Sequence, residues 1–153
     1  MSSFNWCVVN DKLTERTFVM LKPEAVTHRV IGEVIRRIES YGLRISALKL
    51  IHADPKTQVE RLYEMHIGKP YYQKLLDHIT AGPVVPMVVE GEDAVERMRR
   101  LIGTTDPTKA EVGTIRRDYG LSTTENVIHA ADSPQNAERE IRIFFDEEEI
   151  VKY

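Results

Sequence analysis

Residues 17–23 read Thr17-Phe18-Val19-Met20-Leu21-Lys22-Pro23, an apolar run that ends at a lysine and a proline. β-Branched and aromatic residues favour strands, and a proline cannot donate a hydrogen bond to a sheet. The run therefore predicts a strand over 17–21 that is stopped by Pro23. Because a proline ring disfavours a helical backbone in the residue before it, we expect Lys22 to be held in an extended conformation at the end of this strand.

The segments that follow alternate between helical and strand patterns. Apolar residues at helical spacing predict a helix from Val30 to Ile38, with Gly42 where it ends. The same reasoning predicts, in chain order, a strand over 43–51, helical stretches near 55–66 and 71–79, a strand over 83–89, a helix over 92–101, a strand over 126–129 and a helix that opens at Ser133-Pro134. Pro86 is expected to place part of the third strand at an edge or a bulge. Residues 103–121 show no clear periodicity, and loops of that length are usually functional.

The order of these elements is typical of the ferredoxin-like α/β sandwich. We therefore expect an α+β fold with a four-stranded antiparallel sheet, added helices and a long loop, the helices packing on one face of the sheet. Residues 1–14 are interpreted as an N-terminal extension and residues 15–153 as a single domain, because no repeat or linker interrupts them. Fold class alone implies no activity.

Composition excludes several classes of protein. The chain has 153 residues, of which 42% are hydrophobic, as in an ordinary globular domain. Its formal charge is −3, from 21 basic and 24 acidic residues, so the net charge does not favour a long nucleic acid as ligand. A single cysteine, Cys7, excludes an intramolecular disulfide and favours a reduced, cytoplasmic setting. No apolar run is long enough to predict a membrane span.

Residues 126–133, Asn-Val-Ile-His-Ala-Ala-Asp-Ser, place His129 between a short apolar run and a helix-capping sequence. A histidine at such a strand end has little freedom to move. Its neutral imidazole is abundant near pH 7 and carries a free lone pair, so it can act as a nucleophile without a base to deprotonate it. The alternative is a histidine that merely ends a strand.

Three cations indicate a phosphate site. Lys22 follows the first strand, Arg99 lies on the helix that leads into the long loop, and Arg116 lies within that loop. Guanidinium groups bind phosphoryl oxygens in a forked geometry and a lysine neutralises them as a point charge, although each side chain alone could be an ordinary surface charge. The chain has no glycine-rich phosphate loop, so phosphate binding would depend on side chains. The other histidines show no metal-ligand spacing.

Five segments of the chain resemble the nucleoside diphosphate kinase family, in the same order and with the same spacing. They are residues 15–18 with 22–24, 82–88, 103–107, 113–116 and 126–133. The resemblance covers nearly the whole chain, from about Glu15 to Asp146, with one extra residue near Pro55–Gln58.

This resemblance implies an enzyme that transfers the γ-phosphoryl group of a nucleoside triphosphate to a nucleoside diphosphate. The reaction would be ping-pong, through a phosphohistidine at His129. The resemblance also implies the substrate contacts: Lys22, Arg99, Thr105 and Arg116 on the phosphates, Asn126 with Lys22 near the sugar hydroxyls, Tyr71 stacked on the base, and Leu75 on the same clamp. Tyr63 and Glu140 match positions where a phenol and a carboxylate can orient the imidazole. An aromatic at helical spacing, such as Tyr63, is also a common core residue.

The same resemblance implies Mg²⁺, held mainly by the phosphates of the nucleotide and not by a protein metal site. It implies a homo-oligomer, most often a hexamer built from dimers, with residues 103–121 at subunit contacts. The sequence does not decide between a hexamer and a tetramer. Neither a nucleic acid nor a membrane is expected as a partner.

Ala131 departs from the family pattern, which usually has a serine there. That serine is expected to hydrogen-bond the equivalent of Glu140 and to approach the transferred group. Losing such a bond costs about 1.5–3 kcal/mol, or roughly ten- to a hundredfold in rate if it acts in the transition state. We therefore expect an active but slower enzyme. An inactive nucleotide-binding or scaffold subunit is the second hypothesis, and an RNA-binding or regulatory ferredoxin-like module is the third, weakened by the negative charge.

Overall fold

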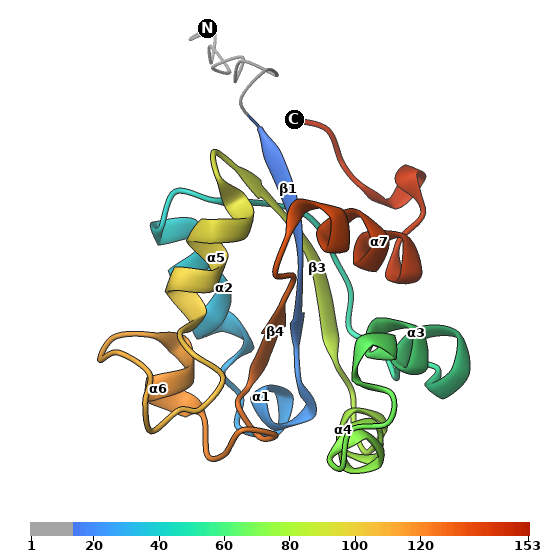
Figure 1. Cartoon of the computed structure of the whole chain (residues 1–153). Helices are drawn as coiled ribbons and strands as arrows, with labels where there is room; N and C mark the ends of the chain where they lie inside the picture. The colour runs from blue at the N-terminus through green and yellow to red at the C-terminus, as the bar shows by residue number, and fades with distance from the viewer. Residues whose placement is uncertain (1–13) are drawn as a thin grey trace, which may run out of the picture.

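Four strands form one antiparallel sheet in the order β2-β3-β1-β4 in this computed structural model, which describes residues 14–153. The strands are β1 (Glu15–Leu21), β2 (Arg44–Leu48), β3 (Val85–Gly91) and β4 (Ile128–Ala130), as Figure 1 shows. The predicted α+β fold with a four-stranded antiparallel sheet is confirmed. The predicted extension lies outside the described residues except for Thr14, and so does Cys7.

Helices and single turns connect and cover the strands. They are α1 (Pro23–Thr27), α2 (Ile31–Ser40), the π-helix η2 (Pro55–Val59), α3 (Glu60–Leu62), the 3₁₀-helix η3 (Glu64–His66), α4 (Tyr72–Thr80), α5 (Ala94–Ile102), α6 (Ile115–Tyr119), α7 (Pro134–Phe144) and the 3₁₀-helix η4 (Glu147–Glu149). The predicted start of α7 is confirmed, because the Ser133 hydroxyl accepts a hydrogen bond from the Asn136 amide and Pro134 occupies the first turn.

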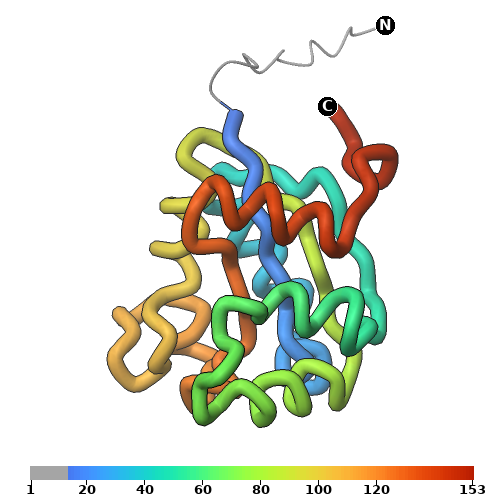
Figure 2. Tube along the Cα trace, turned by 45° about the vertical axis from the view of Figure 1, so that its right-hand side comes forward, coloured from blue at the N-terminus to red at the C-terminus, as the bar shows by residue number. Residues whose placement is uncertain are grey.

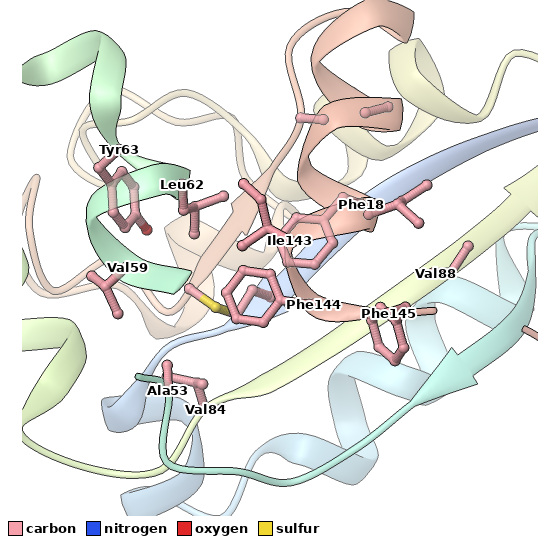
Figure 3. Packing of buried hydrophobic residues seen from close by; sticks show 14 of the residues in the cluster. Phe18, Ala53, Val59, Leu62, Tyr63, Val84, Val88, Ile143, Phe144 and Phe145 are labelled. Carbon is pink, nitrogen blue, oxygen red and sulfur yellow. The ribbon is translucent and has the colours of Figure 1, made fainter. Parts of the chain in front are cut away.

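Helices cover both faces of the sheet, so the expectation of helices on one face was wrong. Phe18 and Met20 pack on one side of β1 in a cluster with residues of α7. The Phe18 and Phe144 rings are stacked, with their centroids 5.0 Å apart (Figure 3). Val19 and Leu21 pack on the other side, with α2 and α5. The physical reason is visible in β1 itself, since its side chains are apolar without alternation and both faces must therefore be buried.

The position of Pro86 also corrects an expectation. β3 lies between β2 and β1, and Pro86 pairs with Met20 inside the sheet and not at its edge. The carbonyl of Pro86 accepts a hydrogen bond from the Lys49 amide, just after β2 ends at Leu48. The amide that proline lacks would face this same side. The proline is therefore tolerated because no regular strand continues beside it.

β2 is shorter than the predicted strand over 43–51. A register shift between Ile45 and Ala47 interrupts its pairing with β3, and Ile51 forms only an isolated bridge with Val84. The bulge breaks the alternation on which the longer strand was predicted.

Residues 103–121 contain the short helix α6, where the sequence showed no periodicity. Thr114 begins this helix by accepting a hydrogen bond from the Arg117 amide with its hydroxyl. The whole segment stands out at one side of the molecule in both views (yellow to orange in Figures 1 and 2). Among the described residues, no helix has the length and apolar character needed to cross a bilayer.

Candidate functional site

A cavity of about 480 Å³ opens where β1 ends and β4 begins. β4 pairs only with the C-terminal half of β1, where His129 lies opposite Met20. This pairing brings residues from segments far apart in the sequence to the same cavity. Every predicted site residue lines this cavity: Lys22, Tyr63, Tyr71, Leu75, Arg99, Thr105, Arg116, Asn126, His129 and Glu140.

His129 lies on β4, and its ring contacts Glu140 of α7. Its Nε2 lies 2.9 Å from Oε2 of Glu140, whose side chain is only 5% exposed. A carboxylate only accepts hydrogen bonds, so we assign the ring proton to Nε2. The lone pair is then on Nδ1. The geometry therefore provides an oriented imidazole with one nitrogen free for chemistry.

Tyr63 borders the imidazole from the other side. Its ring meets that of His129 edge-on, with centroids 5.6 Å apart, and it belongs to the apolar cluster seen in Figure 3. The phenol oxygen is buried and has no hydrogen-bond partner within residues 14–153. Burial raises the pKa of the phenol, and the nearby Glu140 carboxylate raises it further. Tyr63 is thus a core residue whose neutral hydroxyl lies close to the candidate site.

Lys22 is buried at the end of β1, where Pro23 keeps its backbone extended as expected. Its Nζ donates to Oδ1 of Asn126 at 2.7 Å and to the carbonyl of Thr124 at 3.1 Å. Burial lowers the pKa of Lys22 to about 8, against the opposing effect of the Glu24 carboxylate. The free protein therefore holds a lysine that loses its charge slightly above neutral pH.

Arg116 and Arg99 bring two guanidinium groups to the same cavity. Arg116 projects from α6 and donates to the carbonyls of Gly103 and Ile128 at 3.0 and 2.8 Å. Burial and, to a smaller extent, the charge of Arg99 lower the pKa of Arg116 to about 10. Arg99 lies on α5, with Nη1 3.5 Å from the Ala130 carbonyl. These bonds show how the long segment folds back to place a cation beside β4.

Tyr71, Leu75 and Thr105 also line the cavity. Tyr71 is 45% exposed at its mouth, and its hydroxyl lies 2.7 Å from Nδ1 of His66. Leu75, on α4, is buried. Thr105 reaches the cavity from the long segment, and its carbonyl accepts from Nδ2 of Asn126. An exposed aromatic ring and several cations in one cavity suit a ligand with a planar ring and phosphates.

Sequence reasoning missed several residues that line the cavity. They include His66, Thr123, Thr124, Asp132, Asn136 and Arg139. Arg139 could have been noticed because it is adjacent to Glu140 in the sequence. In the structure its Nη2 lies 3.7 Å from Oε1 of that carboxylate. His66 was considered only as a metal ligand, and its contact with Tyr71 leaves no local signal in the sequence.

Comparison with known proteins decides between the hypotheses. The family model for nucleoside diphosphate kinase matches residues 15–150. The chain belongs to the nucleoside diphosphate kinase family. It is therefore an enzyme of nucleotide phosphoryl transfer, and not an RNA-binding module of similar fold.

Relatives and solved structures of the nucleoside diphosphate kinase family match over nearly their whole length. The chain is 55% identical to a nucleoside diphosphate kinase of Sulfurisphaera tokodaii, covering 90% of this chain and 92% of that protein. It is 54% identical to one of Thermosipho melanesiensis, covering 91% and 94%. The apo crystal structure from Encephalitozoon cuniculi superposes with a TM-score of 0.87 at 39% identity, covering 91% and 94%. The enzyme of Halobacterium salinarum in complex with CDP gives a TM-score of 0.87 at 42% identity, covering 91% and 92%.

The buried Lys22 predicts a pH dependence for this family member. A protonated lysine binds phosphate and a neutral one does not, so kcat/KM should fall as pH rises through about 8, by about tenfold per unit once the lysine is mostly neutral. The measurement is kcat/KM for phosphoryl transfer between about pH 7 and pH 9.5. Lys49→Met, at a half-buried lysine that pairs with Glu149 outside the cavity, should keep the descending limb, whereas Lys22→Met should be slow throughout and lack it. A level profile in the unmodified protein would contradict the role of Lys22.

Proposed function

We propose that the enzyme works by a ping-pong mechanism through a phosphohistidine at His129. Nδ1 attacks the γ-phosphorus of the nucleoside triphosphate, and the bond from that phosphorus to the oxygen bridging to the β-phosphate breaks. The diphosphate leaves with the bond electrons. A second diphosphate then attacks the phosphohistidine and regenerates the imidazole. The observation that carries this proposal is the 2.9 Å contact of Nε2 with Glu140, because it leaves Nδ1 as the nucleophilic nitrogen.

The cations around His129 support the same chemistry. Phosphoryl transfer spreads negative charge over three equatorial oxygens, so positioning and electrostatics dominate its catalysis. Lys22, Arg99 and Arg116 line the cavity, and the Thr105 hydroxyl can add a further donor. Glu140 holds the imidazole and stabilises the positive charge that develops on the ring as it reacts, and the Tyr63 ring packs edge-on against the imidazole and restricts its movement.

The nucleotide would lie with its phosphates toward His129 and its base at the mouth. Tyr71 offers a half-exposed ring on which a base can stack, and Leu75 lies on the same side. Asn126 and Lys22, which are hydrogen-bonded to one another, would meet the sugar hydroxyls. Stacking reads no base edge, so we expect broad tolerance of purines and pyrimidines. The CDP complex of the Halobacterium salinarum relative is consistent with a diphosphate as ligand.

We also propose that Mg²⁺ enters with the nucleotide. Asp132 brings a carboxylate to the cavity, and the Asn136 side chain lowers the pKa of that carboxyl by donating a hydrogen bond to it. Phosphate oxygens and water would supply the other ligands, as is common for this ion. When bound, the ion would neutralise phosphate charge during transfer.

Ala131 is proposed to slow the reaction. It is fully buried in the cluster that includes Ala137 and Ile141 of α7. Oε1 of Glu140 lies 3.7 Å from Arg139, too far for a hydrogen bond, so this oxygen is available to a hydroxyl at position 131. Without that donor, Glu140 is restrained mainly through its other oxygen.

The assembly is proposed to be a homohexamer. Val112 and Leu121, in the segment that stands out from the molecule, are 87% and 66% exposed. Burial of these side chains between subunits would favour association. The cytoplasmic setting expected from the single cysteine stays a prediction.

A phosphorylation experiment tests the mechanism. Incubation with ATP labelled in the γ-phosphate should give an acid-labile, base-stable label on the chain, and a nucleoside diphosphate should discharge it. His129→Ala should abolish this label. His52→Ala is the matched control and should retain it, because His52 is exposed and does not line the cavity. Full labelling of the His129 variant would contradict the proposal.

Installing the family's serine tests the role of position 131. Ala131→Ser should raise the rate of phosphoryl transfer roughly ten- to a hundredfold, as expected for a hydrogen bond to a charged group in the transition state. Ala137→Ser adds a hydroxyl to the same buried cluster and should give no increase. A transfer rate unchanged in Ala131→Ser would remove this explanation.

Sedimentation analysis tests the assembly. The full chain should sediment as a hexamer. Val112→Asp with Leu121→Asp places charges on the exposed segment and should shift the species toward smaller oligomers, whereas Leu50→Asp, exposed elsewhere, should not. A monomer at all concentrations, or a stable tetramer, would overturn the hexamer.

A further inference from the structure

Val127 has a strained backbone two residues before the proposed nucleophile. Its φ is +79°, in the left-handed region that β-branched residues rarely adopt. In a regular strand, side chains three positions apart point to opposite faces of the sheet. Asn126 and His129 are three positions apart, yet both line the cavity. The unusual conformation of Val127 therefore allows both side chains to serve one site.

Two hydrogen bonds stabilise this conformation, and both of their partners lie in residues 22–24. The Val127 amide donates to Oε1 of Glu24 at 2.8 Å, and its carbonyl accepts from the Lys22 amide at 2.8 Å. The first of these bonds is buried, and Glu24 itself is 8% exposed. A strained residue persists only where its surroundings over-determine it, and here both polar groups of its backbone are bonded.

The other oxygen of Glu24 is bound by a histidine. Nε2 of His78 lies 2.6 Å from Oε2, and His78 is in the last turn of α4. The same helix carries Leu75, and it begins directly after Tyr71. One carboxylate, on α1, thus connects the helix at the base-binding end of the cavity to the backbone that leads into β4. Neither Glu24 nor His78 lines the cavity.

We propose that Glu24 is a positioning residue that, with His78, holds Val127 in its left-handed conformation and so places His129 for phosphoryl transfer. This role rests on the proposed phosphohistidine route. It assigns a task to a buried acid that would touch neither substrate nor reacting atoms. Glu24 acts through the backbone, whereas Glu140 acts on the imidazole directly.

The test is a single-turnover measurement on the full chain with γ-labelled ATP, recording both the amplitude and the rate constant of His129 phosphorylation. Glu24→Ala should lower the rate constant about ten- to a hundredfold, the effect of misplacing a reacting group, while folded protein still labels to one phosphate per chain. A merely structural role would reduce the amplitude and leave the rate constant of the remaining active molecules unchanged. Glu24→Gln keeps an oxygen acceptor for the Val127 amide and should restore most of the rate.

Substitution of Val127 tests the backbone directly. Glycine adopts a positive φ freely, so Glu24→Ala in a Val127→Gly background should change the rate constant by no more than about twofold, the scatter of independent sites. Val127→Ala removes much of the same buried side chain but keeps the strain. In that background Glu24→Ala should retain its full penalty. Equal penalties in the two backgrounds would overturn the proposal.

Three further variants keep the result decisive if Glu24→Ala does not fold. His78→Leu removes the donor to Glu24 and should lower the rate constant, and His78→Gln, which retains a donor, should recover it. Glu90→Ala removes a half-buried carboxylate that pairs with Arg44 away from the cavity and should leave the rate constant unchanged. An unmodified chain that forms no phosphohistidine would overturn the proposed function itself. A labelled unmodified chain with unchanged rate constants in Glu24→Ala, or in His78→Leu, would overturn only the positioning role.

Discussion

The burial of β1 on both faces is the constraint on which the rest of the structure depends. Phe18 and Met20 on one side, and Val19 and Leu21 on the other, are all fully buried. Such a strand is stable only between two other strands and between two layers of helices. β3 and β4 supply the first requirement, and the helices on the two faces supply the second. The strand ends at Leu21, and the next residue, Lys22, lines the cavity, so the most buried part of the sheet leads directly to the site.

Burial also explains the electrostatics of the site. Lys22 and Arg116 are each 5% exposed, and burial disfavours their charged forms. A site that binds several phosphates needs cations that are poorly compensated by protein carboxylates. Here the cations are held mostly by backbone carbonyls and an amide oxygen. Their charge is therefore left for the ligand.

From the sequence, the order of the elements and the residues around the cavity were predicted more accurately than the local backbone conformation. The proline after Lys22 was sufficient to place the end of β1, whereas β2 was predicted too long because its bulge leaves no local signal. The family motifs supplied the candidate site residues. The left-handed Val127 could not be predicted, because positive φ is signalled by glycine or asparagine and not by valine. α6 was missed because five residues show little periodicity. The uninterrupted apolar run of β1 indicates that helices cover both faces of the sheet. The prediction of helices on one face followed the usual ferredoxin-like sandwich instead.

The π-helix Pro55–Val59 lies where the resemblance predicted an extra residue, and a π-turn holds one more residue per hydrogen bond than an α-turn. A turn of this kind accommodates the added residue before the chain reaches Tyr63, so the Tyr63 ring remains beside the imidazole.

The buried Lys22 has a consequence of another kind. If anionic phosphates restore its proton, nucleotide binding near pH 8 takes up hydrogen ions from solution. The observed heat of binding would then include the ionisation enthalpy of the buffer, and occupancy of the site would be linked thermodynamically to the surrounding acidity.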